Sequence, residues 1–180
     1  GKSSLAAVFL QRGFPLISDD LIVLDPADPS FHVPPAVPGM RLRADVADLV
    51  FGPDHELPRG IEDDKYYLDL SAQPAQFASA PRPLAAVFLL GGANSGAVDH
   101  GIRQLTPKEA LLRLSRFAYL PNLMDKNMHR VQFATLAALL RTIPAYQLPT
   151  VPDLARLPDL SQEILDTLAD INSFSTCLLE

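Results

Sequence analysis

The stretch G-K-S-S-L-A-A-V-F-L-Q-R-G, residues 1–13, decides how the fold begins. From position 3 onward it consists mainly of leucine, alanine and other residues that a helix accommodates well, so it predicts a helix over residues 3–12. Gly13 is expected to end this helix, because glycine readily adopts the left-handed conformation found just past helix ends. The first turn of the predicted helix therefore carries two serines, and Lys2 directly precedes it.

The same stretch contains the end of a phosphate-binding motif. A P-loop reads G-x-x-x-x-G-K-[ST] and leads from a strand into a helix, and Gly1, Lys2 and Ser3 match its last three positions. In such a loop the lysine contacts the β- and γ-phosphates, the hydroxyl ligates Mg²⁺, and amides at the helix start hold the anion. We expect Gly1, Lys2, Ser3 and Ser4 to bind nucleotide phosphates. We also expect the first strand and the start of the loop to be missing from residues 1–180.

Two adjacent acids, Asp19 and Asp20, follow the predicted helix. They lie between two short apolar runs, residues 16–18 and 21–24, which predict a buried strand, a break and a second strand. In a parallel sheet the end of this strand lies beside the phosphate loop, so the start of the helix is expected close to both acids. A carboxylate there can hold Mg²⁺ or accept a proton from an attacking hydroxyl. For the pair taken alone, a solvated turn is the alternative.

The first 24 residues, G-K-S-S-L-A-A-V-F-L-Q-R-G-F-P-L-I-S-D-D-L-I-V-L, resemble the core of the HPr serine kinase/phosphorylase family. The matching positions are the loop end Gly1-Lys2-Ser3, the helix end Arg12-Gly13 and the acid pair Asp19-Asp20. The resemblance implies an α/β fold, a P-loop-containing mixed sheet flanked by helices, similar to HPr kinase and phosphoenolpyruvate carboxykinase.

The resemblance also implies an activity and a role for each residue. The chain would be an ATP-dependent serine kinase that transfers the γ-phosphoryl group to a serine of a small protein or peptide. Lys2 and Asp20 would be catalytic, with Asp20 accepting the proton of the substrate serine, while Ser3 and Asp19 would bind Mg²⁺. ATP and Mg²⁺ are the implied cofactors. A small-metabolite P-loop kinase and a non-catalytic nucleotide-binding regulatory protein are the alternatives.

Helices and strands are expected to alternate through the rest of the chain, which predicts one α/β domain over residues 1–180 with a mixed sheet. Thr106-Pro107-Lys108-Glu109 is typical of a helix start, with threonine as the N-cap and glutamate reaching back to it. The helices after the first are expected over residues 45–51, 107–119, 128–141 and 161–172. The further strands are expected over residues 31–33, 65–70, 84–90, 102–105 and 145–148.

Composition excludes several classes of protein. The net charge of −6 and the scattered basic residues argue against broad nucleic-acid binding. No apolar run approaches the roughly 18 residues that a membrane span needs. The single Cys177 excludes an internal disulfide, so we expect a cytoplasmic protein. The four histidines lack the spacing of a zinc hydrolase. Self-association into a homo-oligomer is compatible with this composition.

Overall fold

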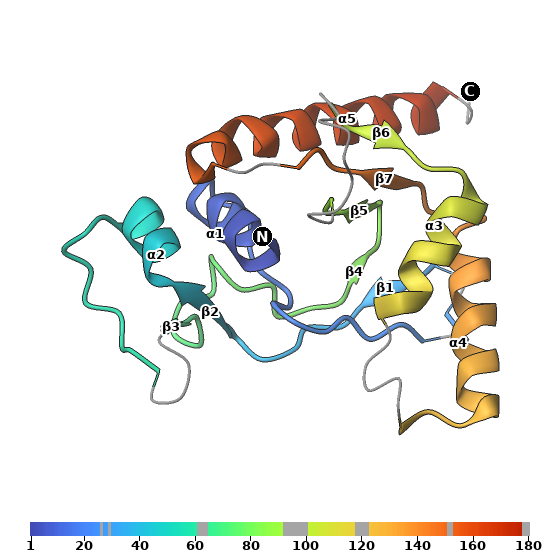
Figure 1. The fold of residues 1–180 in the computed structure, drawn as a ribbon, viewed down its shortest axis with the longest axis horizontal. Coiled ribbons are helices and arrows are strands. Elements are labelled where there is room, and N and C mark those ends of the chain that lie inside the picture. Colours follow the sequence, from blue (N-terminus) through green and yellow to red (C-terminus); the bar gives the residue numbers. More distant parts are fainter. Residues whose placement is uncertain are drawn as a thin grey trace. The chain divides into compact units, whose positions relative to one another are not determined.

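The computed structural model describes residues 1–25, 27–28, 30–60, 65–91, 101–117, 123–150 and 153–177. These residues form a mixed α/β structure with five α-helices and three small sheets (Figure 1). Their contacts divide the chain into two compact units. Unit 1 comprises Gly1–Ile22, Pro34–Pro81 and Val151–Glu180, and unit 2 comprises Val23–Val33 and Arg82–Thr150. The single domain expected over residues 1–180 stays a prediction.

Helix α1, Lys2–Gln11, confirms the helix predicted at the start of the chain. Gly13, at φ +87°, donates its N–H to the Leu10 carbonyl, and Phe14 donates its N–H to the Phe9 carbonyl, both at 3.0 Å. The Phe9 and Phe14 rings meet edge to face with their centroids 5.8 Å apart. These bonds form a Schellman motif, which satisfies carbonyls at the helix end and depends on the left-handed conformation of Gly13.

Within unit 1, helix α1 packs against α5, Leu157–Cys177, and hydrogen bonds from Arg12 at the end of α1 join the two helices. Arg12 Nη1 donates to Ser161 Oγ at 2.6 Å, and Arg12 Nη2 donates to Gln162 Oε1 at 2.5 Å. Ser161 is fully buried and donates its own hydroxyl to the Pro158 carbonyl at 2.6 Å. The guanidinium therefore supplies the donor that this buried hydroxyl oxygen needs.

The two-stranded sheet of unit 1 pairs β2, Gly39–Arg43, antiparallel with β3, Lys65–Asp69. Strand β2 runs directly into α2, Ala44–Phe51. This helix confirms the one predicted over residues 45–51. Met40 and Leu42 point to the buried side of β2, while Arg41 and Arg43 are exposed. Helix α1 and helix α2 both contact β2, so this strand lies at the centre of unit 1.

The strands predicted on either side of the acid pair are wrong. Leu16 forms only an isolated parallel bridge with Phe77, and residues 21–24 form no strand. Leu21, Ile22 and Val23 are between 46% and 64% exposed. An apolar run becomes a buried strand only where neighbouring strands take up its backbone hydrogen bonds and cover its faces. Among the described residues, nothing provides that cover for residues 21–23.

Unit 2 contains a mixed sheet, as predicted, with three short strands. Strand β7, Ala145–Gln147, pairs parallel with β5, Val87–Leu89, and antiparallel with β6, Arg103–Gln104. A separate antiparallel pair joins β1, His32–Val33, to β4, Arg82–Pro83. β5 is shorter than the predicted strand over residues 84–90, and β4 was not predicted at all.

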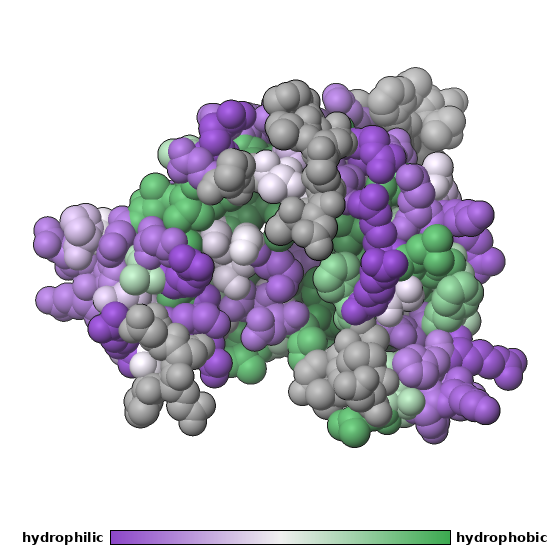
Figure 2. All heavy atoms as spheres, viewed as in Figure 1, coloured by the Kyte–Doolittle hydropathy of each residue, from purple (hydrophilic) through white to green (hydrophobic). Residues whose placement is uncertain are grey.

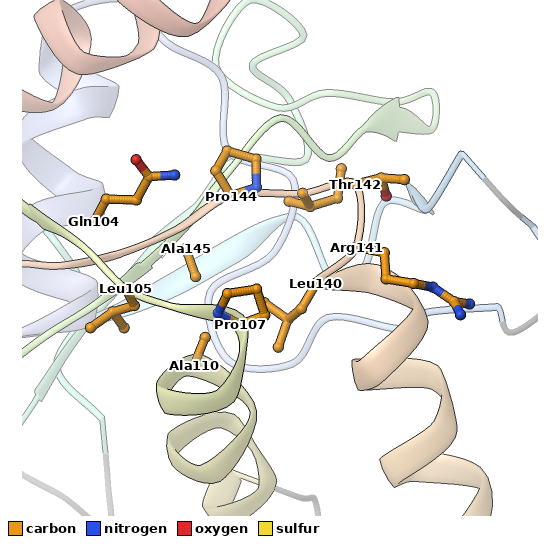
Figure 3. A pocket seen from close by; sticks show the side chains of 10 residues that line it. Gln104, Leu105, Pro107, Ala110, Leu140, Arg141, Thr142, Pro144 and Ala145 are labelled. Atoms are coloured by element: carbon orange, nitrogen blue, oxygen red, sulfur yellow. The ribbon is translucent and has the colours of Figure 1, made fainter.

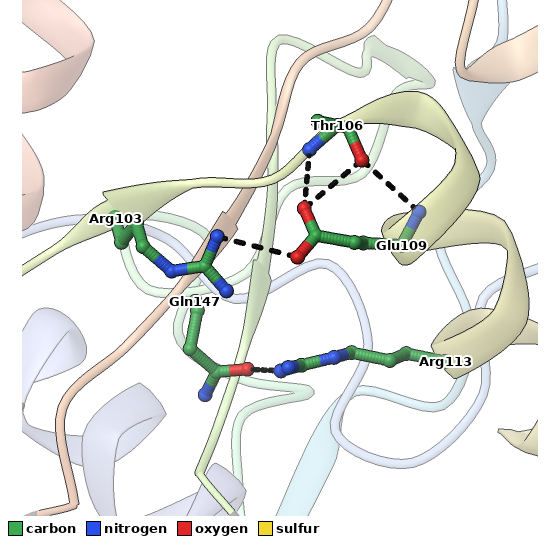
Figure 4. A network of polar contacts seen from close by, with 5 residues as sticks. All are labelled: Arg103, Thr106, Glu109, Arg113 and Gln147. Atoms are coloured by element: carbon green, nitrogen blue, oxygen red, sulfur yellow. Dashed lines mark hydrogen bonds and ion pairs between the residues drawn. The ribbon is translucent and has the colours of Figure 1, made fainter. Parts of the chain in front are cut away.

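The predicted capping box begins α3, Pro107–Leu114, as Figure 4 shows. Glu109 Oε2 accepts from the Thr106 N–H at 2.9 Å, and Thr106 Oγ1 accepts from the Glu109 N–H at 3.3 Å. The Thr106 N–H and the Thr106 hydroxyl both donate to the Glu109 carboxylate, and these two bonds, helped by the nearby Arg103, hold the pKa of the Glu109 carboxyl below its usual value. The α-helix ends at Leu114, before the predicted end, and residue 119 lies outside the described residues.

A short 3₁₀ helix, η1, Ser115–Phe117, follows α3, and α4 spans Lys126–Leu139. Asp125 caps α4 by accepting from the Met128 N–H at 2.7 Å, so the helix begins before the predicted position. The core of unit 2 is formed by buried side chains from β5, β7, α3, α4 and their flanking segments: Phe31, Leu89, Leu105, Ala110, Leu139, Leu140 and Ala145. Within the described ranges, every helix is too short or too polar to cross a membrane.

Candidate functional site

The four predicted phosphate-binding residues lie together on the first turn of α1. Gly1 occupies the N-cap position and has no side chain with which to cap the helix, and the first turn contains no acid. Lys2 is exposed, Ser3 is half-buried and Ser4 is buried. Because no side-chain oxygen occupies the amides at this helix start, their partial positive charge is directed at whatever anion approaches.

Asp19 is the predicted metal ligand whose surroundings are best defined. Its Oδ2 accepts from the backbone N–H of Arg41 in β2 at 3.2 Å. Its Oδ1 is buried and has no hydrogen-bond partner among the described residues. A buried carboxylate oxygen without a donor is costly, and a cation or a further donor would relieve that cost. Carboxylate oxygen is also the ligand that Mg²⁺ prefers, so Asp19 fits the predicted role.

The structure brings only some of the predicted site residues together. Asp19 is bonded to β2, and α1 packs against the same strand. Asp20 is exposed, and within the described residues neither the Asp20 carboxylate nor the Lys2 ammonium forms a hydrogen bond or an ion pair. No cluster of three or more histidine, cysteine or acidic side chains arranged to hold a metal occurs in that part of the chain. The expected proximity of the helix start to both acids stays a prediction.

Sequence reasoning missed a buried histidine in unit 1. The His55 side chain is only 6% exposed, and its ring meets the Tyr66 ring edge to face at 4.5 Å. Its Nδ1 accepts from the Leu57 N–H at 3.4 Å, while Nε2 lies 3.4 Å from Asp48 Oδ1 without a hydrogen bond. Nothing in the spacing of the four histidines indicated this burial, because the contacts come from residues on α2 and β3.

Unit 2 contains a pocket of about 210 Å³ that no sequence motif indicated (Figure 3). It lies between the start of α3 and the turn that follows α4, and its lining is Gln104, Leu105, Pro107, Ala110, Leu140, Arg141, Thr142, Ile143, Pro144 and Ala145. In Figure 3 the Arg141 side chain extends away from Pro107 and Ala110. The lining mixes apolar side chains with the polar Gln104, Arg141 and Thr142, and it includes no histidine, cysteine or carboxylate.

Comparison with known proteins finds no match to this chain among protein families, curated proteins or solved structures. Among the predicted site residues, the start of α1 and the unpartnered oxygen of Asp19 are the features that call for a ligand.

Proposed function

We propose that this chain is the core of an ATP-dependent serine kinase similar to the HPr serine kinase/phosphorylase family. The finer fold would be a P-loop-containing mixed sheet, of which α1 is the helix after the loop. One observation carries the proposal: G-K-S-S opens a regular helix with an uncapped first turn, and the following segment keeps an unpartnered, buried carboxylate oxygen on Asp19. An anion and a cation would satisfy these two features respectively.

ATP would bind with its phosphates at the start of α1. The amides of Lys2, Ser3 and Ser4 would donate to phosphate oxygens, and the Lys2 ammonium would neutralise charge on the β- and γ-phosphates. Lys2 is exposed and forms no ion pair within the described residues, so no carboxylate of those residues has to be displaced before ATP binds. This arrangement acts by positioning and by charge neutralisation, the two effects that dominate phosphoryl transfer.

Ser3 and Asp19 would hold Mg²⁺, which supplies charge neutralisation between the β- and γ-phosphates when bound. Asp19 Oδ1 is the candidate ligand atom, because Oδ2 is engaged by the Arg41 amide. That hydrogen bond fixes the orientation of the carboxylate before the metal arrives. A metal held by one hydroxyl and one carboxylate, with phosphates and water completing the shell, is the usual arrangement for Mg²⁺.

Asp20 would be the base for the substrate serine. As the serine oxygen attacks the γ-phosphorus, the bond to the β–γ bridging oxygen breaks, ADP leaves, and the hydroxyl proton moves to the Asp20 carboxylate. The products are ADP and a phosphoserine. Asp20 is exposed, which leaves its carboxylate accessible to a protein or peptide.

The non-catalytic nucleotide-binding alternative is favoured by one feature. Asp20 has no hydrogen bond within the described part of the chain that would orient its carboxylate, and the strand expected to carry it is absent there. A catalytic base is normally held in position by a partner. ATP binding without phosphoryl transfer would therefore indicate the regulatory function.

Isothermal titration with Mg·ATP tests the binding half of the proposal. The five earlier positions of a complete P-loop would precede Gly1, so the polypeptide should carry its natural N-terminal residues. We expect binding that Lys2→Ala weakens at least tenfold. Lys126→Ala is the matched control, because Lys126 is likewise the first residue of a helix, α4, and is exposed. Absence of Mg·ATP binding, or equal loss in both variants, would end the kinase proposal.

A further inference from the structure

Four polar side chains of unit 2 form a layer between α3 and the strands β6 and β7 (Figure 4). Arg103 and Gln147 are directly opposite each other in the antiparallel ladder of β6 and β7, so their side chains lie on the same face of the sheet. Glu109 and Arg113 are four residues apart on α3 and share one face of that helix. Arg113 Nη1 donates to Gln147 Oε1, and Arg103 Nη1 lies 3.5 Å from Glu109 Oε1. Each arginine therefore joins the helix to the sheet.

The Gln147 amide is fixed by the ends of two parallel strands. Its Nε2 donates to the Leu89 carbonyl at 3.0 Å and to the Leu148 carbonyl at 2.9 Å. Both hydrogens of the amide nitrogen are thus engaged, and Oε1 is the atom left to accept from Arg113. Leu89 and Gln147 are the last residues of the parallel strands β5 and β7. The carboxyl ends of parallel strands are where ligands of α/β sheets commonly bind.

The layer has an excess of positive charge, with two guanidinium groups and one carboxylate. Both oxygens of that carboxylate are engaged, because Glu109 Oε2 accepts from the Thr106 N–H and hydroxyl, each at 2.9 Å, and Oε1 faces Arg103. Arg113 is half-buried, and its partner among the described residues is the neutral amide of Gln147. A guanidinium has five N–H donors, and a partly buried cation without a counter-ion is costly. The layer is therefore suited to an anion.

The layer is open to solvent at its edge. The Arg103 and Glu109 side chains are 45% and 41% exposed. Figure 2 shows hydrophilic residues in purple at the surface over β6 and the adjoining part of α3. A dissolved ligand can therefore reach the two arginines.

We propose that Arg103 and Arg113 bind the carboxylate group of a ligand. The N–H donors of a guanidinium match the two oxygens of a carboxylate in direction and spacing. One carboxylate brings the charge of the layer to zero, whereas a phosphate group, with a charge of about −1.5 to −2, leaves it negative. A small organic acid and the C-terminus of a peptide both present this group. The site lies in unit 2 and is independent of the proposed kinase site.

Nuclear magnetic resonance titration of the intact chain can test this by following the Nε–H signals of the arginines at neutral pH. Benzoate, benzamide and phenyl phosphate are matched probes, because they share one ring and differ in the charge of its substituent. We expect benzoate to shift the Arg103 and Arg113 signals and to bind at least tenfold more tightly than neutral benzamide, since hydrogen bonds to a charged group are the stronger ones. Phenyl phosphate should bind less tightly than benzoate.

Substitution tests the two arginines separately. Arg103→Met and Arg113→Met keep an apolar stem and remove the guanidinium, and each should weaken benzoate binding at least tenfold. Arg116→Met is the matched control, because Arg116 is an exposed arginine of η1 in the same unit, and it should bind benzoate normally. Circular dichroism shows whether each variant is folded, and the arginine signals of the wild type test the site without any substitution.

A pair of peptides distinguishes the two sources of the carboxylate. Acetyl-Gly-Gly-Phe with a free C-terminus is compared with its C-terminal amide. Binding of the free acid more tightly than benzoate would assign a peptide C-terminus, and weaker or equal binding would assign a small organic acid. Benzoate binding no tighter than that of benzamide would overturn the proposal, as would arginine signals that benzoate leaves unshifted. Equal losses in Arg113→Met and Arg116→Met, or tighter binding of phenyl phosphate than of benzoate, would overturn it as well.

Discussion

Replacing Gly13 with alanine isolates the contribution of backbone conformation to the helix that carries the candidate phosphate site. Gly13 has φ +87°, and a Cβ built on it meets no atom within 4 Å, so the substitution causes no clash. An L-residue in the left-handed region costs about 1–2 kcal/mol. The unfolded chain loses freedom on gaining a Cβ, which offsets about 0.4–1 kcal/mol of that cost. We therefore expect the free energy of unfolding to fall by about 1 kcal/mol.

Urea unfolding followed by circular dichroism at 222 nm measures this effect. With an m-value of about 1–3 kcal/mol/M, the Gly13→Ala midpoint should fall by about 0.3–1 M. Gly13→Asn is the matched control, because asparagine tolerates the left-handed conformation better than alanine and should lose less stability. A midpoint for Gly13→Ala equal to that of the wild type would refute the reasoning. So would identical midpoints for the alanine and asparagine variants, since strain at φ would then not be the cause.

Three further predictions concern the N-terminal cap of α3 and the hydrogen bond between Arg12 and Ser161. Thr106→Ala removes the N-cap of α3 and should lower stability by about 1 kcal/mol in urea unfolding. The folded-state pKa of Glu109 lies below its unfolded value, so its stabilising contribution is present above about pH 4.3 and is lost as the pH falls through the folded pKa. In an acid titration, the Glu109→Gln variant should therefore lose less folding stability than the wild type. Arg12→Ala should destabilise by about 1 kcal/mol, and a double-mutant cycle with Ser161→Ala should show coupling, whereas additive effects would mean that the contact does not stabilise the fold.

Features set by residues close in sequence could be predicted from the sequence alone. Helix α1 and its stop at Gly13 follow from composition and from one glycine, and the start of α3 follows from Thr106 and Glu109. In each case the groups that satisfy the backbone lie within a few residues of the helix end. The four predicted phosphate-binding residues are grouped on one turn for the same reason, because they are contiguous.

Features that depend on distant partners could not be predicted in this way. Strand β2 was not identified as a strand, because its partner β3 lies more than 20 residues further along the chain. At Gly39 of β2 the Tyr67 side chain comes so close that any Cβ would collide with it, and no local pattern reveals this contact. Conversely, residues 21–24 resembled a strand but have no neighbour to pair with in the described residues. The hydrogen bond from Arg41 to Asp19 likewise became visible only in three dimensions.

Transfer of labelled γ-phosphate from ATP tests the central proposal most directly. The wild-type polypeptide with its natural N-terminal residues is compared with Asp20→Asn at saturating Mg·ATP, using serine-containing peptides and the protein HPr as acceptors. Asn preserves the shape of the side chain and removes its charge, so the rate should fall by about 10²–10⁴-fold while ATP affinity changes little. Equal rates for wild type and Asp20→Asn would contradict the role of Asp20, and ATP binding without transfer to any acceptor would contradict the kinase proposal itself.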